Sequence, residues 1–190
     1  MVTERPMGLR PMSVESTAID GLMVIRLKEI TDERGTVREF YRQSAFADFA
    51  LPDLGAFLQI NLTESRYGAL RGLHGEDMWK LVAIAAGSAF GAYVDGRTES
   101  PTYGQVVTVE LEVGTQVLLP AGVCNAFQTT STEGSQYLYA FNAEWVPGMA
   151  GVAYCPVDPA LGISWPVPVD LDDVAQLSVK DRTAPPFPAR

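Results

Sequence analysis

The sequence is poor in the residues that bind metal ions. Its 190 residues include one histidine, His74, and two cysteines, Cys124 and Cys155, which form no C-x-x-C motif. A metal site on a β fold normally uses two or three histidines with a carboxylate, and one histidine cannot supply that set. We therefore expect no metal and no cofactor. The two cysteines indicate reduced thiols in a cytoplasmic protein.

Long apolar runs and an excess of basic residues are also missing. The sequence has no apolar run of the roughly eighteen residues that a transmembrane helix needs. The N-terminal segment MVTERPMGLRPMS is polar and contains proline, so we expect no signal peptide. The chain has 14 Lys and Arg against 23 Asp and Glu, a net charge of −9. We therefore expect neither a nucleic-acid nor a membrane partner, although a few placed arginines can still make one pocket basic.

Two common catalytic motifs are absent from the sequence. No G-x-G-x-x-G segment follows a strand and opens a helix, so a dinucleotide site of the Rossmann type is excluded. No G-x-S-x-G segment occurs, which excludes the usual nucleophile elbow of a hydrolase. Any catalysis must therefore use other residues.

Short segments with alternating apolar and polar residues fill most of the chain. Turn residues recur about every eight to twelve positions, which is typical of β-sandwiches and barrels and not of βαβ units. We predict an all-β, jelly-roll-like β-sandwich of roughly ten strands. The expected strands are 22–30, 36–42, 57–65, 80–96 with a break at Gly87, 104–123 with a turn at Gly114, 126–145 with a turn at Gly134, and 151–157.

The sequence is consistent with one domain over residues 1–190. We expect residues 1–20 to form an N-terminal extension and residues 166–190 to form a C-terminal segment that wraps the body. A short helical piece is expected at 44–56, and one or two helical turns are expected at 170–179.

The single histidine lies in the segment LRGLHGEDMWK, residues 70–80. Two glycines of this segment flank His74, so the backbone there can approach a ligand closely. Arg71 and Lys80 place two cations near the imidazole, which favours its neutral form and suits a general base. The alternative is a surface or capping histidine among ordinary surface charges.

Six short motifs follow one another along the chain: RGLH, KLV, SPTYG, LPAGV, DPALGISWP and LSVKD. Together they resemble the dTDP-4-dehydrorhamnose 3,5-epimerase family, over residues 20–181. The resemblance implies a cupin-like jelly-roll β-sandwich with a short C-terminal helical tail. It also implies a metal-free homodimer that acts on dTDP-linked 4-keto-6-deoxyhexoses in deoxysugar biosynthesis.

The resemblance implies chemistry by enolisation. The 4-keto group acidifies the protons on C3 and C5, a base removes one of them, and an acid returns a proton to the opposite face. In the family the base is the histidine of RGLH, paired with the aspartate of LSxKD, and these positions are His74 and Asp181. Lys80, in the strand after the histidine, is expected to stabilise the enolate.

The resemblance also nominates residues that bind the substrate. Arg71 would face the diphosphate, where a guanidinium fits phosphate oxygens, and Lys180 would contribute there. For Glu39 and Gln59 the alternative is a solvated strand face. The residues expected to reach the nucleotide are Arg34 and Glu39, in DERG and REF, and Gln59 and Asn61, in QIN.

The chain departs from the family pattern at three places. The loop GEDMW between His74 and Lys80 is short, and Trp79 is expected to supply an aromatic wall of the sugar pocket. Asn125 occupies the position of a histidine that touches the substrate, and an amide does not titrate. Trp145 stands where the family has its acidic tyrosine, and an indole is no general acid at neutral pH.

These departures shape the expected function. We predict an epimerase that acts mainly at C3, with 3,5-epimerisation as the second form. Because Trp145 replaces the family tyrosine, water, Tyr93 or Tyr139 is left as the proton donor, and we place Asn125, Tyr139 and Trp145 among the substrate-binding residues. The alternatives are a keto-isomerase that converts the 4-keto sugar to its 3-keto isomer and a non-catalytic sugar-nucleotide binder. The set of His74 with its partners favours catalysis.

Overall fold

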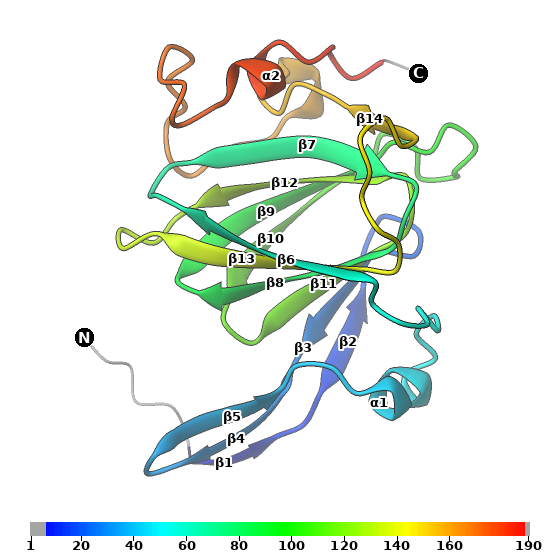
Figure 1. Ribbon diagram of the computed structural model, residues 1–190, viewed down its shortest axis with the longest axis vertical. Helices are drawn as coiled ribbons and strands as arrows, with labels where there is room; N and C mark the ends of the chain where they lie inside the picture. Colours follow the sequence, from blue (N-terminus) through cyan, green and yellow to red (C-terminus); the bar gives the residue numbers. More distant parts are fainter. Residues whose placement is uncertain (1–6, 189–190) are drawn as a thin grey trace.

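Fourteen strands in three antiparallel sheets form the framework of residues 7–188, the part of the chain that the computed structural model describes (Figure 1). Two of the sheets pack face to face, which confirms the predicted all-β jelly-roll class. The first has the order β2-β3-β11-β8-β13-β6. Its strands are β2 (Ser13–Ser16), β3 (Met23–Arg26), β11 (Thr115–Leu119), β8 (Lys80–Ala86), β13 (Ser135–Phe141) and β6 (Gln59–Ser65).

The second sheet of the sandwich has the order β10-β9-β12-β7-β14. The predicted turns at Gly87, Gly114 and Gly134 lie between consecutive strands of the sandwich, which confirms the pattern on which the strands were predicted. The strands of this sheet are β10 (Val106–Glu112), β9 (Ser88–Asp95), β12 (Val123–Thr129), β7 (Leu70–Glu76) and β14 (Gly151–Ala153).

Alternation along the strands divides the apolar side chains between the two faces of each sheet. Val117 and Leu119 of β11 point between the sheets, where they join a buried cluster with Tyr93 and Phe127. Leu118, between them in sequence, points to the outer face of the six-stranded sheet. The main core therefore lies between the two sheets, and each sheet has an outer face that another segment must cover.

Short helical segments and loops cover these outer faces. Helix α1 (Gln43–Asp48) contributes Phe46 to a cluster on the six-stranded sheet. The C-terminal part of the chain contributes Leu161, in the 3₁₀ helix η1 (Pro159–Leu161), and Leu177 to a cluster on the five-stranded sheet. The C-terminal segment thereby lies across the sheet that contains β7.

The third sheet extends away from the sandwich, with the order β1-β4-β5 (Figure 1). Its strands are β1 (Gly8–Arg10), β4 (Lys28–Asp32) and β5 (Gly35–Glu39).

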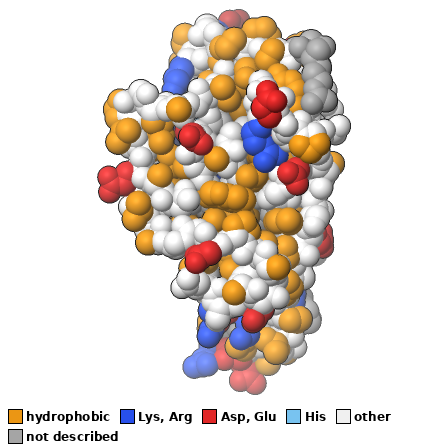
Figure 2. Space-filling view, turned by 90° about the vertical axis from the view of Figure 1, so that its right-hand side faces the viewer, with side chains coloured by type: hydrophobic (Ala, Val, Ile, Leu, Met, Phe, Trp, Pro, Cys, Tyr) orange, Lys and Arg blue, Asp and Glu red, His pale blue; other side chains and the backbone are white. Residues whose placement is uncertain are grey.

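The prediction of one strand over 22–30 is wrong, because the chain bends at Leu27 and passes from the six-stranded sheet to this one. Leu27 is buried, and its amide donates to the carbonyl oxygen of Gly114 at 2.9 Å. This division adds to the strand count, which exceeds the predicted ten. Figure 2 shows basic and acidic side chains gathered at this narrow end of the molecule.

The predicted helical turns at 170–179 are misplaced. Helix α2 (Val179–Arg182) begins where that range ends. In the preceding residues Asp170 and Asp173 accept hydrogen bonds from backbone amides two positions further on, at 2.9 Å each. Such side-chain bonds compete with helical bonds and favour turns, which explains why the helix starts late.

The expected N-terminal extension adds strands to the sheets, and the expected C-terminal segment packs on the outer face of one of them. Residues 8–10 and 13–16 of the predicted N-terminal extension form β1 and β2, and the C-terminal segment packs on the five-stranded sheet. The division into one domain with these boundaries stays a prediction, and residues 1–6 and 189–190 lie outside the described part. No helix within residues 7–188 is long and apolar enough to cross a membrane.

Candidate active site

The single histidine forms a hydrogen-bonded pair with an aspartate from the C-terminal segment. His74 lies in β7, and its Nε2 is 2.8 Å from Oδ1 of Asp181 in α2. The Asp181 carboxyl group is buried, whereas the His74 side chain is about one-third exposed. The pair therefore couples a buried carboxylate to an imidazole that solvent and small molecules can reach.

The start of α2 holds the carboxylate in place. Ser178 caps the helix, because its Oγ accepts a hydrogen bond from the Asp181 amide at 3.1 Å. Burial by itself raises the pKa of Asp181, but the hydrogen bond and charge of His74 act in the opposite direction. Further hydrogen bonds from Ser178 and the Gly72 amide add to this, so that the pKa lies below its usual value. A carboxylate of this kind stabilises an imidazolium beside it.

Arg71 and His74 lie on the same side of β7 although they are three residues apart, which a regular strand does not allow. The register between β7 and β12 shifts here: Asn125 lies opposite His74, and Phe127 lies opposite Arg71. Within the irregular part, Gly72 has a φ of +121°, and a Cβ there would lie 2.6 Å from backbone atoms of β12. This bulge therefore requires glycine, and it turns both functional side chains toward one site.

Two cavities share His74 as a lining residue, and together they gather six of the predicted site residues. The first has a volume of about 410 Å³ and the second about 320 Å³. The titratable side chains that line the first, besides His74, are Arg71, Tyr139 and Asp181. The charged or aromatic side chains that line the second, besides His74, are Glu76, Trp145 and Lys180.

Tyr139 lies on β13, in the sheet opposite β7, and lines the same cavity as His74. Burial raises the pKa of the Tyr139 hydroxyl, which keeps it protonated and able to donate a proton or a hydrogen bond. Tyr93, the other candidate donor, is fully buried in the cluster between the sheets. Of these two tyrosines, the structure brings Tyr139 to the site.

Lys80 lies beneath the site and bridges the two sheets of the sandwich. Its side chain is 3% exposed. The ammonium forms an ion pair with Glu76 and donates to Oδ1 of Asn125 at 2.8 Å and to the backbone oxygen of His74 at 3.3 Å. Asn125 therefore orients Lys80, a use of the amide that sequence reasoning did not identify.

Glu76 is the site residue that the sequence analysis missed. It lies two residues after His74 on β7, so its side chain projects from the same face of the strand. It also lies four residues before Lys80 and pairs with it. The two-residue spacing from the histidine was a signal in the sequence, but the ion pair depends on how β7 and β8 face each other.

Trp145 lines the second cavity and is hydrogen-bonded to Gln59. The Trp145 side chain is about half exposed, and its backbone amide donates to Oε1 of Gln59 at 2.7 Å. Nε2 of Gln59 donates to Oδ1 of Asn61 at 3.1 Å. Trp79, expected as an aromatic wall of the sugar pocket, packs instead on the outer face of the six-stranded sheet. It precedes Lys80, and alternate residues of a strand point to opposite faces.

Arg34 and Glu39 are not brought to His74 within one chain. Glu39 ends β5 and Arg34 lies in the turn between β4 and β5, so both are at the opposite end of the molecule from α2 (Figure 1). Arg34 is exposed and binds Asp32 with a shortest distance of 2.6 Å, and Glu39 forms an ion pair with Arg42.

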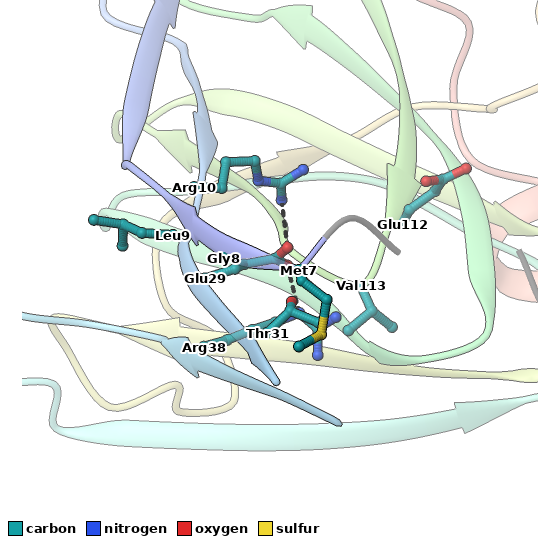
Figure 3. Close-up of a pocket in the computed structure, with 9 residues that line it drawn as sticks. All are labelled: Met7, Gly8, Leu9, Arg10, Glu29, Thr31, Arg38, Glu112 and Val113. Atoms are coloured by element: carbon teal, nitrogen blue, oxygen red, sulfur yellow. Dashed lines mark hydrogen bonds and ion pairs between the residues drawn. The ribbon is translucent and has the colours of Figure 1, made fainter. Parts of the chain in front are cut away.

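The same sheet contains a separate cavity of about 250 Å³ (Figure 3). Glu29 at its wall is bound by Arg10 at 3.0 Å and by Arg38 at 2.5 Å. None of its lining residues is a predicted site residue. The arginine of the REF motif therefore serves the packing of this sheet.

Comparison with known proteins gives a consistent result. A family described as dTDP-4-dehydrorhamnose 3,5-epimerase matches residues 16–189. The chain is 37% identical over 180 residues to a dTDP-4-dehydrorhamnose 3,5-epimerase of Salmonella typhimurium, covering 92% of this chain and 94% of the relative.

Solved structures of this kind are also similar. The chain resembles a dTDP-6-deoxy-D-glucose-3,5-epimerase from Legionella pneumophila in complex with dTDP-4-keto-L-rhamnose, with a TM-score of 0.83, 32% identity and coverage of 93% of both chains. It also resembles a 3'-monoepimerase from Streptomyces bikiniensis in complex with dTDP-quinovose, with a TM-score of 0.81, 28% identity and coverage of 91% and 87%.

Proposed function

This chain belongs to the dTDP-4-dehydrorhamnose 3,5-epimerase family, and we propose that it epimerises a dTDP-4-keto-6-deoxyhexose by enolisation beside the 4-keto group. The observation that carries this proposal is the His74–Asp181 pair, which lies where two cavities meet. A base oriented by a buried carboxylate, beside room for a sugar nucleotide, is what proton abstraction next to a ketone requires.

The proposed reaction begins with His74. The imidazole removes the proton from the carbon next to the ketone, and the C–H electron pair becomes the enolate. Asp181 orients the ring and stabilises the imidazolium that forms, because its lowered pKa keeps it ionised. Lys80, which the sequence analysis expected to stabilise the enolate, lines neither cavity. Its ammonium is bound to Glu76, Asn125 and the backbone oxygen of His74, so we assign it to holding these groups in place.

We assign Tyr139 as the acid that returns the proton. Inversion requires a donor on the side of the sugar opposite the base. Tyr139 extends from the six-stranded sheet, whereas His74 extends from the five-stranded sheet, and both line one cavity. Trp145, at the second cavity, then serves as an apolar surface for the sugar and not as a proton donor.

The remaining predicted residues fit a role in binding the nucleotide. Arg71 and Lys180 line the two cavities and carry the charge that a diphosphate requires. Gln59 and Asn61 lie on β6, next to the strand that carries Tyr139. No cluster of three or more His, Cys, Asp or Glu side chains that could hold a metal ion occurs within residues 7–188.

We further propose that the protein is a homodimer in which Arg34 and Glu39 reach the site of a second copy. The support is an uncovered apolar face: Leu58, Ile60 and Leu62 share one side of β6 and its approach, and each is more than half exposed. A contiguous apolar patch of this kind marks a protein interface. A cytoplasmic location is supported by the two free thiols, Cys124 and Cys155.

The experiment that tests the function is proton NMR of the purified protein with dTDP-4-keto-6-deoxyglucose in deuterium oxide. We expect deuterium to enter at C3 with inversion, and to enter C5 more slowly or not at all. His74→Ala is the control and should abolish both exchange and inversion. Exchange at C3 without inversion, together with a 3-keto product, would indicate a keto-isomerase instead. Tight nucleotide binding without any exchange would show a non-catalytic binder and would overturn the proposal.

A further inference from the structure

Glu76 lies between the buried Lys80 and the second cavity. Its side chain is 19% exposed and lines that cavity together with His74 and Trp145, whereas the Lys80 side chain beneath it is 3% exposed. The proton transfers proposed above use His74 and Tyr139 and leave this carboxylate without a role. A carboxylate on the wall of a sugar cavity, two residues from the base, nevertheless has a direct chemical use.

The surroundings of Lys80 hold Glu76 in one orientation. An ammonium group has three N–H donors. Three acceptors surround that of Lys80: the Glu76 carboxylate, Oδ1 of Asn125 at 2.8 Å and the backbone oxygen of His74 at 3.3 Å. An ion pair that is this buried and shared with an amide restricts the carboxylate more than an exposed pair would. Glu76 is therefore a preorganised hydrogen-bond acceptor.

A bound sugar offers few partners for such an acceptor. An ionised carboxylate accepts hydrogen bonds and donates none, and its two oxygens have about four lone-pair sites, of which Lys80 uses only part. In a dTDP-4-keto-6-deoxyhexose the ring carries two hydroxyl groups, on C2 and C3. The other ring carbons bear the diphosphate, the ketone and the methyl group. His74 and Glu76 project from the same face of β7 and line the second cavity, so a sugar placed for proton abstraction by His74 would have its hydroxyl groups within reach of Glu76.

We infer that Glu76 is a specificity-determining residue that accepts a hydrogen bond from the C2 or C3 hydroxyl of the sugar, and that Lys80 and Asn125 are its positioning residues. This inference rests on the proposed function. The charge of Lys80 offsets that of Glu76, so the pair does not oppose the enolate. A substrate that lacks the contacted hydroxyl would leave the partly buried carboxylate with an unused acceptor, which is the basis of strong discrimination in polar sites.

The test is a cycle that combines changes in the protein with changes in the sugar. Wild type and Glu76→Gln are each assayed with dTDP-4-keto-6-deoxyglucose and with its 2-deoxy and 3-deoxy analogues. The readouts are kcat/KM for deuterium exchange and Kd. Wild type should discriminate against one analogue by roughly ten- to a hundredfold, because a hydrogen bond to a charged group is lost. Glu76→Gln should reduce that discrimination about tenfold, because an amide oxygen is the weaker acceptor.

Two further variants keep the test decisive. Glu76→Ala removes the acceptor and should abolish the discrimination, and Asp77→Asn removes a neighbouring exposed carboxylate and should leave it unchanged. Affinity for dTDP should be the same in all variants, which shows that the fold is retained.

The cycle distinguishes contact with the sugar from an effect through Lys80 alone. The inference is supported if the Glu76 substitution and the loss of one sugar hydroxyl have non-additive effects on kcat/KM or Kd. Equal losses in the Glu76 variants with all three sugars would overturn it. If wild type binds the sugars but exchanges no proton, the proposed function fails, whereas discrimination in Kd still decides the role of Glu76.

Discussion

Nε2 of His74 lies 2.8 Å from Oδ1 of Asp181, and this bond joins residues 107 positions apart in the sequence. Asp181→Asn should lower the rate of deuterium exchange by roughly 10²–10⁴-fold, because the amide neither orients the imidazole correctly nor stabilises its charged form. Exchange followed by NMR measures this loss. Asp172→Asn, a change of an exposed carboxylate in the same segment, is the control and should keep wild-type activity. An Asp181→Asn rate within twofold of wild type would contradict the assignment.

Tyr139→Phe should separate proton removal from inversion. Without the hydroxyl, His74 still removes and returns a proton on its own side, so deuterium enters the substrate while inversion falls about a hundredfold or more. The ratio of inverted product to total exchange, measured by NMR, reports the difference. Tyr93→Phe removes a hydroxyl from the buried core and should leave this ratio unchanged. An unchanged ratio in Tyr139→Phe would show that another group is the acid.

Gly72→Ala should destabilise the protein by roughly 2–5 kcal/mol, as the sum of an unfavourable positive φ and overpacking. A Cβ at this position would lie 2.6 Å from backbone atoms of β12. Urea unfolding measures the change in the free energy of unfolding. The matched control is Gly162→Ala, where φ is +62° but a Cβ meets no atom within 4 Å. That variant should lose only about 1 kcal/mol, and equal losses in the two variants would exclude the steric explanation.

Asp95 should make the free energy of unfolding depend on pH. Its buried carboxylate accepts bonds from Arg97 at 2.8 Å and from Ser100 and Thr102 at 2.6 Å. Burial raises the pKa of Asp95, but these bonds outweigh burial, and the pKa lies far below its usual value. The group therefore stabilises the fold above the unfolded-state pKa of about 3.9, and this stabilisation is lost as the pH falls below about 4.

Substitution of this carboxylate isolates its contribution. Asp95→Asn should cost roughly 3 kcal/mol at pH 7 and should flatten the fall in unfolding free energy between about pH 5 and pH 2. Unfolding by urea at several pH values measures both effects. Asp32→Asn, which breaks an exposed pair with Arg34, should leave the slope near that of wild type. A slope for Asp95→Asn equal to that of wild type would refute the assignment.

Ile60→Asp should disrupt the proposed homodimer. Ile60 lies in the middle of the apolar face of β6 and is 60% exposed in the single chain. Burial of a charge there without a partner is unfavourable, so sedimentation velocity should show a monomer where wild type shows a dimer. Leu171→Asp changes another exposed apolar residue, in the C-terminal segment, and should leave the dimer intact. A monomeric wild type would contradict the proposal.

Much of the fold follows from local patterns in the sequence. Glycines at 87, 114 and 134 separate alternating apolar segments, and each marks a connection between consecutive strands of the sandwich. These features are predictable because turns and two-residue alternation depend on neighbours in the sequence. The sequence also singled out His74, as its one histidine, and Asp181, through the LSVKD motif.

The tertiary structure decided how these segments face one another. Whether Trp79 or Trp145 joins the site depends on which face of a sheet each one meets. The split of the 22–30 strand at Leu27 depends on a hydrogen bond to a turn that is distant in the sequence. The Glu76–Lys80 pair and the turn of Arg71 toward His74 depend on the meeting of two sheets and on a bulge against β12. Local alternation specifies that a residue changes face at each step, whereas register and packing between distant segments select which face becomes the site.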